Sequence, residues 1–297
     1  MKTSLDNRQG VLFAIPAVIW GSTWYAITFQ LGQVDPLYSV AYRFILAGVV
    51  LIAFCKIRNI SLSFTREQHL RILLQALCLF GFNYWFAYQS EQYIASGLVA
   101  LIFSLIIFLN MGFGRLILKT PLRKHVMVGA ILGLIGTALI FAPELLAYEM
   151  NRKTILGLAF CLGGVLMASL GNITSAYNQQ LHQLPVISTN AIGMLYGGVA
   201  MFLIAWVSGK PISFSPTLPY VLSLIYLAII GSIISFTAYL TLIGKIGADK
   251  AAYALVIVPL IAIIISMIFE DYRLSWLAGL GIVFLILGNV IALRKSS

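Results

Sequence analysis

Amide, hydroxyl and aromatic side chains gather between Phe82 and Asn110, inside a chain that is otherwise strongly apolar. Apolar helices usually carry few amides, because an unpaired polar group in hydrocarbon costs several kcal/mol. A polar and aromatic face on one membrane hairpin therefore predicts a lined cavity that can hold a solute. A similar hairpin recurs between Ser235 and Phe269.

Two tryptophans in the first apolar run are candidates for the same cavity. Trp20 and Trp24 are four residues apart and share one helix face. Tryptophan is common at membrane surfaces, which alone explains Trp24, but Trp20 lies too deep for that explanation. Tyr84 and Tyr88 form an equivalent pair, for which the surface and cavity explanations are balanced.

Amides and hydroxyls deep in apolar runs are better discriminators, because enrichment at membrane surfaces does not explain them. Their alternative role is hydrogen bonding between helices, which is common and modest in strength. We predict that the following residues bind the solute: Trp20, Trp24, Asn83, Tyr84, Tyr88, Ser104, Asn110, Asn172, Ser235 and Tyr239.

Arg43 is the only ionisable residue well inside an apolar run. It could attract a carboxylate of the solute, but we favour a structural role, because a charge in the membrane is costly whichever purpose it serves. Pro259 should kink its helix rather than free a carbonyl for the solute. Gly129 and Gly281 should allow close helix packing. We assign these four residues structural or gating roles.

The apolar runs lack the residues that catalysis or metal binding would need. Acidic residues and lysines fall outside the interiors of the runs, and the three histidines fall in connections. A nucleophile with its base, or a cluster of metal ligands, cannot be assembled. The three cysteines lie in or beside apolar runs and give no disulfide framework. We therefore predict no enzyme activity, no metal and no cofactor.

Composition places the elements that carry these residues in a membrane. Of 297 residues, 61% are hydrophobic and 9% are charged, and the mean hydropathy is +0.98. Soluble domains average about 25% charged residues. The net charge of +10 comes from basic residues in short connections, which membrane orientation explains better than nucleic-acid binding does. The predicted fold class is an all-α membrane protein.

Ten membrane spans are predicted, since about 20 helical residues cross the hydrocarbon core. They cover Gly10–Leu31, Pro36–Cys55, Ile72–Gln89, Ile94–Leu118, Val126–Leu146, Ile155–Tyr177, Val186–Val207, Leu218–Ile243, Ala251–Phe269 and Leu274–Leu293. With a cytoplasmic N-terminus, 14 of the 19 basic residues fall in cytoplasmic segments and four fall outside, with Arg43 inside a span. This bias follows the positive-inside rule and requires an even number of spans. Both termini are therefore predicted to be cytoplasmic.

A weak internal repeat divides the chain into two halves. Without gaps, the fourth and fifth spans align with the last two, which pairs Ile94 with Ile246 and Gly129 with Gly281. With five spans in each half, the second copy enters the membrane from the opposite side. We therefore predict two inverted five-helix repeats, residues 1–146 and 147–297, around a site near the membrane midplane.

Four short motifs stand out along the chain: Trp20-Gly21-Ser22, Pro36 with Arg43, Tyr88 with Ala95-Ser96-Gly97, and Val256-Ile257-Val258-Pro259 leading to Glu270. Together they resemble motifs of the EamA-type transporters of the drug/metabolite transporter superfamily. The resemblance covers essentially the whole chain. It implies ten helices, alternating access, and a cavity lined by the first, third, fourth, sixth, eighth and ninth spans. In the first copy Ile107 stands opposite Pro259, so the fourth span is expected to bend less than the ninth.

The predicted function is a transporter that exports or exchanges small polar metabolites across a bacterial inner membrane. An aromatic, amide-rich cavity with at most one fixed positive charge favours amino acids or similar zwitterions. Nucleotide sugars and other phosphorylated metabolites are the alternative, although they call for several basic residues at depth. A membrane receptor or a membrane-embedded enzyme is the alternative from another class. We expect a monomer in the lipid bilayer, with a homodimer as the alternative.

Transport is expected to need no proton carried by a membrane-embedded carboxylate, because the span interiors offer no Asp, Glu or His for a relay. The competing hypothesis is that Glu91 folds inward from its hairpin tip and couples transport to protons.

Overall fold

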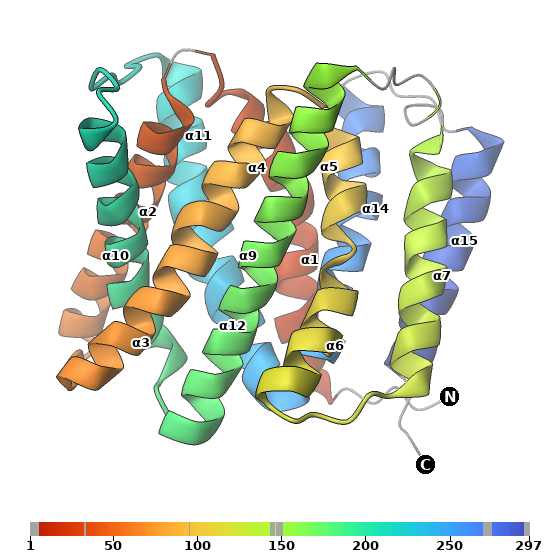
Figure 1. The fold of residues 1–297 in the computed structure, drawn as a ribbon, viewed down its shortest axis with the longest axis horizontal. Helices are drawn as coiled ribbons and strands as arrows, with labels where there is room; N and C mark the ends of the chain where they lie inside the picture. Colours follow the sequence, from red (N-terminus) through yellow and green to blue (C-terminus); the bar gives the residue numbers. More distant parts are fainter. Residues whose placement is uncertain are drawn as a thin grey trace.

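The computed structural model describes residues 6–32, 34–94, 96–142, 146, 151–269 and 275–293, and within these ranges the regular elements are all helical. The helices run side by side as one bundle (Figure 1). Among the described residues, six helical stretches are long and apolar enough to cross a membrane, and three shorter apolar helices accompany them. Many large apolar side chains on the outside are exposed, including Leu116, Val207 and Leu218, as expected for a lipid-facing surface. The all-α membrane class is confirmed.

The described residues of the first half of the chain form seven α-helices and one π-helical segment. They are α1 (Asn7–Thr28), α2 (Pro36–Ile57), α3 (Arg66–Ala76), η1 (Leu77–Phe82), α4 (Asn83–Glu91), α5 (Ser96–Phe103), α6 (Ile106–Ile117) and α7 (Lys124–Ile140). Capping boxes start α1 and α3, where Asp6 pairs with Gln9 and Thr65 pairs with Gln68. These caps satisfy backbone N–H groups that have no partner inside the helix.

The second half repeats this order of elements. Its described elements are α9 (Arg152–His182), α10 (Val186–Val207), α11 (Leu218–Ala228), η2 (Ile229–Ile234), α12 (Ser235–Ile246), α13 (Ala248–Ala251), α14 (Tyr253–Phe269) and α15 (Trp276–Ala292). Each of the ten predicted spans overlaps helical residues of this set or of the first half. The helix α1 begins and α15 ends on the same side of the bundle (Figure 1).

Two π-helical segments, η1 and η2, interrupt equivalent helices of the two halves. They start at Leu77 and Ile229, which are separated by the same number of positions as Ile94 and Ile246. A π-segment inserts an extra residue into a helical turn and is found frequently at functional sites. The equivalent placement shows that the two halves share an uncommon backbone feature as well as a hydropathy pattern.

The fourth predicted span is broken at Ser104 and Leu105, between α5 and α6. The Ser104 hydroxyl donates to the Leu101 carbonyl at 2.5 Å, and the backbone N–H groups of both residues bond three residues back. By contrast, α14 continues through Pro259. The fourth span is therefore interrupted without a proline, because a serine that bonds its own backbone can interrupt a helix. The expected difference in bending between the fourth and ninth spans stays a prediction.

Glycines bring α7 and α15 into backbone contact. A methyl group on Gly129 would lie 2.5 Å from the Gly288 carbonyl oxygen, and one on Gly136 would lie 2.6 Å from that of Gly281. Between these two contacts the residue number increases along α7 and decreases along α15, so the two helices are antiparallel. The close helix packing expected of Gly129 and Gly281 is what this crossing requires.

The helices α2 and α10 cross in the same manner. A methyl group on Gly48 would lie 2.6 Å from the Leu195 backbone nitrogen, and one on Gly198 would lie 2.6 Å from that of Ile45. This pair is also antiparallel. The α2–α10 pair lies at one end of the bundle and the α7–α15 pair at the other, with α1, α9 and α12 between them (Figure 1).

Candidate functional site

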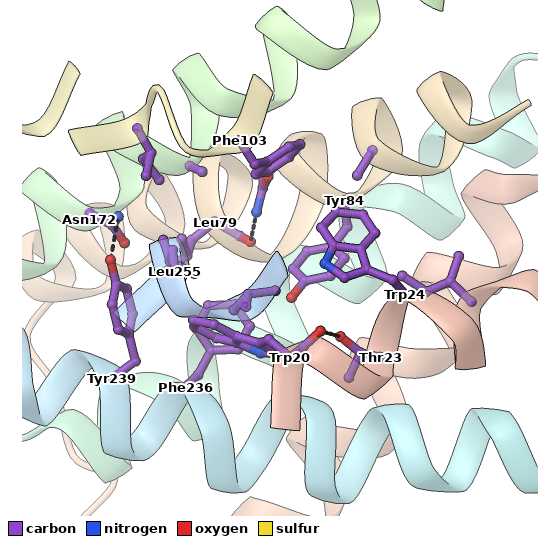
Figure 2. Close-up of a pocket in the computed structure, with 16 residues that line it drawn as sticks. Trp20, Thr23, Trp24, Leu79, Tyr84, Phe103, Asn172, Phe236, Tyr239 and Leu255 are labelled. Atoms are coloured by element: carbon purple, nitrogen blue, oxygen red, sulfur yellow. Dashed lines mark hydrogen bonds between the residues drawn. The ribbon is translucent and has the colours of Figure 1, made fainter. Parts of the chain in front are cut away.

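A cavity lies in the middle of the bundle, and sixteen residues line it (Figure 2). They come from α1, η1, α4, α5, α6, α9, α12 and α14. These elements belong to the six predicted spans that the family resemblance implied as the lining. The broken span contributes from both of its pieces, through Phe103 of α5 and Ile106 of α6.

Aromatic rings form much of the wall. Trp20 makes edge contacts with Phe236 and Tyr239, with ring centres 5.0 and 5.1 Å apart. Its indole N–H donates to the Gly231 carbonyl at 3.0 Å, so that η2 fixes the orientation of the ring. Trp24 contacts Phe103 at 5.7 Å. Figure 2 shows Trp20 beside Phe236 and Trp24 beside Tyr84. Such a wall suits an apolar or aromatic part of a solute.

Two buried amides supply the polar part of the lining. Asn172 donates to the Tyr239 hydroxyl at 3.3 Å, as Figure 2 shows, and Asn83 donates to the Leu79 carbonyl at 3.4 Å. Both side-chain carbonyl oxygens are buried without a hydrogen-bond partner among the described residues. A buried acceptor without a partner is costly, so these oxygens are places where a donor group of a solute would bind.

The size of the cavity restricts what it can hold. The centre of a water molecule can occupy a volume of about 80 Å³ inside the cavity. This is room for roughly five to eight waters, at 10–15 Å³ for each. In this conformation the cavity suits a small solute.

Six of the ten residues predicted to bind the solute line the cavity. They are Trp20, Trp24, Asn83, Tyr84, Asn172 and Tyr239. They come together from α1, α4, α9 and α12.

The other four predicted residues lie outside the lining. Asn110 bridges helices, since it donates to the Ala248 carbonyl at 3.1 Å and accepts from Ser169 at 2.8 Å. Ser104 and Ser235 bond their own backbones. Tyr88 is fully buried behind the cavity wall. Asn110 therefore has the alternative role of polar groups in hydrocarbon, which is holding helices together.

Sequence reasoning missed most of the apolar lining. The missed residues are Thr23, Ile27, Leu79, Ala87, Phe103, Ile106, Ala168, Phe236, Leu255 and Val258. The internal repeat contained a signal from which some of these lining residues could have been predicted. The spacing that relates Ile94 to Ile246 also relates Tyr84 to Phe236, Phe103 to Leu255 and Ile106 to Val258, and all six of these positions line the cavity.

Two of the four structural or gating candidates, Arg43 and Pro259, lie beside the cavity lining. Arg43 is fully buried, with its guanidinium carbon 4.4 Å from the centre of the Tyr84 ring. Pro259 follows the lining residue Val258. Because proline has no N–H, the carbonyl of Leu255 lacks the usual helical bond from that position. Gly129 and Gly281 lie away from the lining, in the α7–α15 contact.

Acidic residues are absent from the described lining of this cavity. Within the described ranges there is also no group of three or more His, Cys, Asp or Glu side chains that could hold a metal. Glu91 ends α4, and both of its carboxylate oxygens are buried without a hydrogen-bond partner among the described residues. A proton-coupling acid would need such a setting, but it would also need to reach the solute pathway.

Glu91→Gln tests the coupling hypothesis with almost no change of shape. Because the cavity lining contains no acid, we expect solute flux in proteoliposomes to be insensitive to an imposed pH gradient and unchanged in Glu91→Gln. The matched control is Glu67→Gln, at an exposed glutamate that pairs with Arg71. Uphill uptake driven by the pH gradient, lost in Glu91→Gln and kept in Glu67→Gln, would show that Glu91 couples transport.

A helical membrane bundle around a central cavity, lined by both halves of the chain, is the architecture of a membrane transporter. The chain belongs to the EamA-like transporter family, whose sequence profile matches residues 8–142 and 155–294. The family resemblance seen in the motifs is thereby confirmed.

Relatives match over nearly the whole chain. The uncharacterized inner membrane transporter YedA of Escherichia coli K12 is 29% identical, over 92% of this chain and 87% of the relative. Protein PagO of Salmonella typhimurium LT2 is 26% identical, over 95% and 92%. The uncharacterized transporter YvbV of Bacillus subtilis 168 is 27% identical, over 94% and 90%. One solved crystal structure shares the fold, with a TM-score of 0.78 at 17% identity and 96% coverage of both chains.

Proposed function

We propose that this protein moves small zwitterions, amino acids above all, across the membrane as an exporter or exchanger. The observation that carries the proposal is the cavity itself. It combines a wall of aromatic rings with two buried amide oxygens, on Asn83 and Asn172, that have no partner among the described residues. The rings suit the apolar side chain of an amino acid, and the oxygens suit its ammonium group.

Phosphorylated metabolites fit this cavity less well. Recognition of a phosphate dianion usually employs several arginines or lysines, and the described lining contains neither. The small volume of the cavity also disfavours nucleotide sugars. The second candidate function therefore lacks an observation in its favour.

We further propose alternating access by two inverted five-helix repeats, residues 1–146 and 147–297. Paired contacts support this. Gly48 and Gly198 occupy the same position counted from the starts of α2 and α10, and each packs on the equivalent partner, Leu195 or Ile45. Because these equivalent helices run antiparallel, one half is inverted relative to the other. Two such halves can rock about a central site.

The membrane topology is proposed on the same basis. Ten spans with both termini in the cytoplasm agree with the positive-inside bias and with the common side on which α1 begins and α15 ends. The name of the relative YedA places that protein in an inner membrane, and we propose the same location here. We propose a monomer as the functional unit.

A receptor and a membrane-embedded enzyme are the functions from other classes. The missing metal cluster within the described ranges and the missing acids in the cavity lining favour transport over catalysis. Conversion of a solute into a different product by the purified protein would overturn the proposal.

Solute class can be measured with purified protein in detergent. We expect one or more amino acids to raise the melting temperature, and the same compounds to move across proteoliposome membranes. Nucleosides and phosphorylated metabolites, tested in the same panel, should give no shift. Stabilisation by sugar nucleotides alone would contradict the proposed substrate class.

A further inference from the structure

Arg43 is a buried cation with most of its hydrogen-bonding capacity unused. It lies on α2 with no exposed surface. Its Nε donates to the Ser232 hydroxyl at 3.0 Å, while both terminal nitrogens lack a partner among the described residues. The ion pairs found within the described ranges also do not include it. A guanidinium has five N–H donors, and a buried charge without a counter-charge is strongly unfavourable.

The guanidinium stands directly behind the cavity wall. It lies over the face of Tyr84, which lines the cavity. One terminal nitrogen and the Thr23 side chain approach the same spot, since a methyl group on Gly231 would lie 3.3 Å from the nitrogen and 3.0 Å from the Thr23 methyl. Thr23 also lines the cavity. Two lining residues, Thr23 and Tyr84, therefore lie beside the guanidinium.

The π-segment η2 fixes this orientation. Ser232 of η2 donates its hydroxyl hydrogen to the Leu227 carbonyl at 2.9 Å, which leaves its oxygen lone pairs to accept from Arg43. The Nε side of the guanidinium is thereby anchored, and the two terminal nitrogens are free. An arginine that only holds helices together would donate hydrogen bonds from those nitrogens to backbone carbonyls.

A second unused donor lies beside the guanidinium. The Tyr88 hydroxyl is buried and has no hydrogen-bond partner among the described residues. Tyr88 lies one turn after Tyr84 on the same face of α4, and Arg43 lies over the Tyr84 ring. A tyrosine oxygen that faces the guanidinium still has its O–H hydrogen to donate. The terminal N–H groups of Arg43 and this O–H are a donor set for one planar anion.

We propose that Arg43 and Tyr88 form the carboxylate subsite of the transporter, which opens to the cavity between Thr23 and Tyr84. The two terminal nitrogens bind the carboxylate in a bidentate manner, and the Tyr88 hydroxyl donates a further hydrogen bond. A single positive charge matches a carboxylate rather than a phosphate dianion. The inference rests on the proposed function and assigns Arg43 a binding role in place of the structural role that its sequence context favoured.

The subsite also sets the direction in which a zwitterion binds. Tyr84 and Asn172 lie on opposite sides of the cavity view in Figure 2. The carboxylate faces the Tyr84 side, and the ammonium group faces the free oxygen of Asn172. The aromatic rings between them then contact the apolar side chain.

The test compares each solute with its decarboxylated form. Each proteinogenic amino acid is first screened on the wild-type protein by thermal shift, and the one with the largest shift is titrated beside its decarboxylated amine. We expect Arg43→Gln to weaken amino-acid binding by about 10- to 100-fold, as loss of a charged hydrogen-bond pair does, and to leave amine binding unchanged. Tyr88→Phe should show a smaller loss with the same selectivity.

Controls separate this inference from the proposed function and from misfolding. Arg71→Gln, at an arginine in the middle of α3 that pairs with Glu67, should change neither affinity. Arg43→Lys keeps the charge and should bind the amino acid with intermediate affinity, which keeps the test decisive if Arg43→Gln does not fold. Equal loss for amino acid and amine in the Arg43 variants would overturn the subsite. A wild-type protein that binds no amino acid would instead overturn the proposed function.

Discussion

Trp20→Ala is expected to weaken solute binding by about 30-fold or more, the loss of about 2 kcal/mol that marks a central binding residue. Trp20 is 7% exposed and contacts both Phe236 and Tyr239 in the wall. Its removal takes away an aromatic face and leaves both neighbouring rings without support. Binding measured by titration in detergent, together with flux in proteoliposomes, gives the magnitude.

The matched control for Trp20→Ala is Trp206→Ala. Trp206 is 60% exposed, near the end of α10 and outside the cavity lining, so its loss should leave solute affinity unchanged. Melting temperatures of both variants separate weaker binding from general instability, because removal of a large core side chain also destabilises a fold. Wild-type affinity in a folded Trp20→Ala protein would exclude this cavity as the solute site.

Gly281→Leu is expected to prevent the normal packing of α7 against α15. Even a methyl group at Gly281 would lie 2.5 Å from the Gly136 carbonyl oxygen and 2.9 Å from the Ile140 nitrogen. These are backbone atoms, so the helices must separate to make room. Overpacking of this kind costs about 1–3 kcal/mol and occasionally more. We expect a large fall in melting temperature or loss of monodisperse protein.

The control for this substitution lies on the same helix. A methyl group on Gly279 would have no atom of a neighbouring described element within 4 Å, and Gly279→Leu should retain the wild-type melting temperature. Because both variants add the same side chain to α15, any difference between them reports the α7–α15 contact. Equal stability of the two variants would show that this contact contributes little to the fold.

Much of the architecture could be predicted from composition and hydropathy. A chain that is 61% hydrophobic must place its backbone polar groups in helices to satisfy them in a membrane. Each predicted span therefore overlaps a helix, and Trp20 could be assigned to the cavity because its depth excluded a surface role. Close helix packing was also predicted for Gly129 and Gly281, and both lie in the contact between α7 and α15.

The periodicity of apolar residues in the sequence did not predict local features of the backbone. The break at Ser104 depends on a hydroxyl that bonds its own backbone. The segments η1 and η2 each insert an extra residue into a turn, which rotates everything that follows around the helix axis. The faces of the residues that follow, such as Tyr84 and Phe236, are therefore set by the inserted residue as well as by regular helical spacing.

The sequence by itself determined the class of protein, the approximate positions of its helices, its division into two repeats, and which polar residues lie within the apolar helices. Only the tertiary structure decided which of those groups meet the solute space. Asn110 and Asn172 are both amides deep in apolar helices, yet Asn110 bridges two neighbouring elements and Asn172 lines the cavity. The reason is physical. A buried amide forms hydrogen bonds with the partners that the crossing of helices brings within reach. These crossings arise from contacts between residues far apart in the chain.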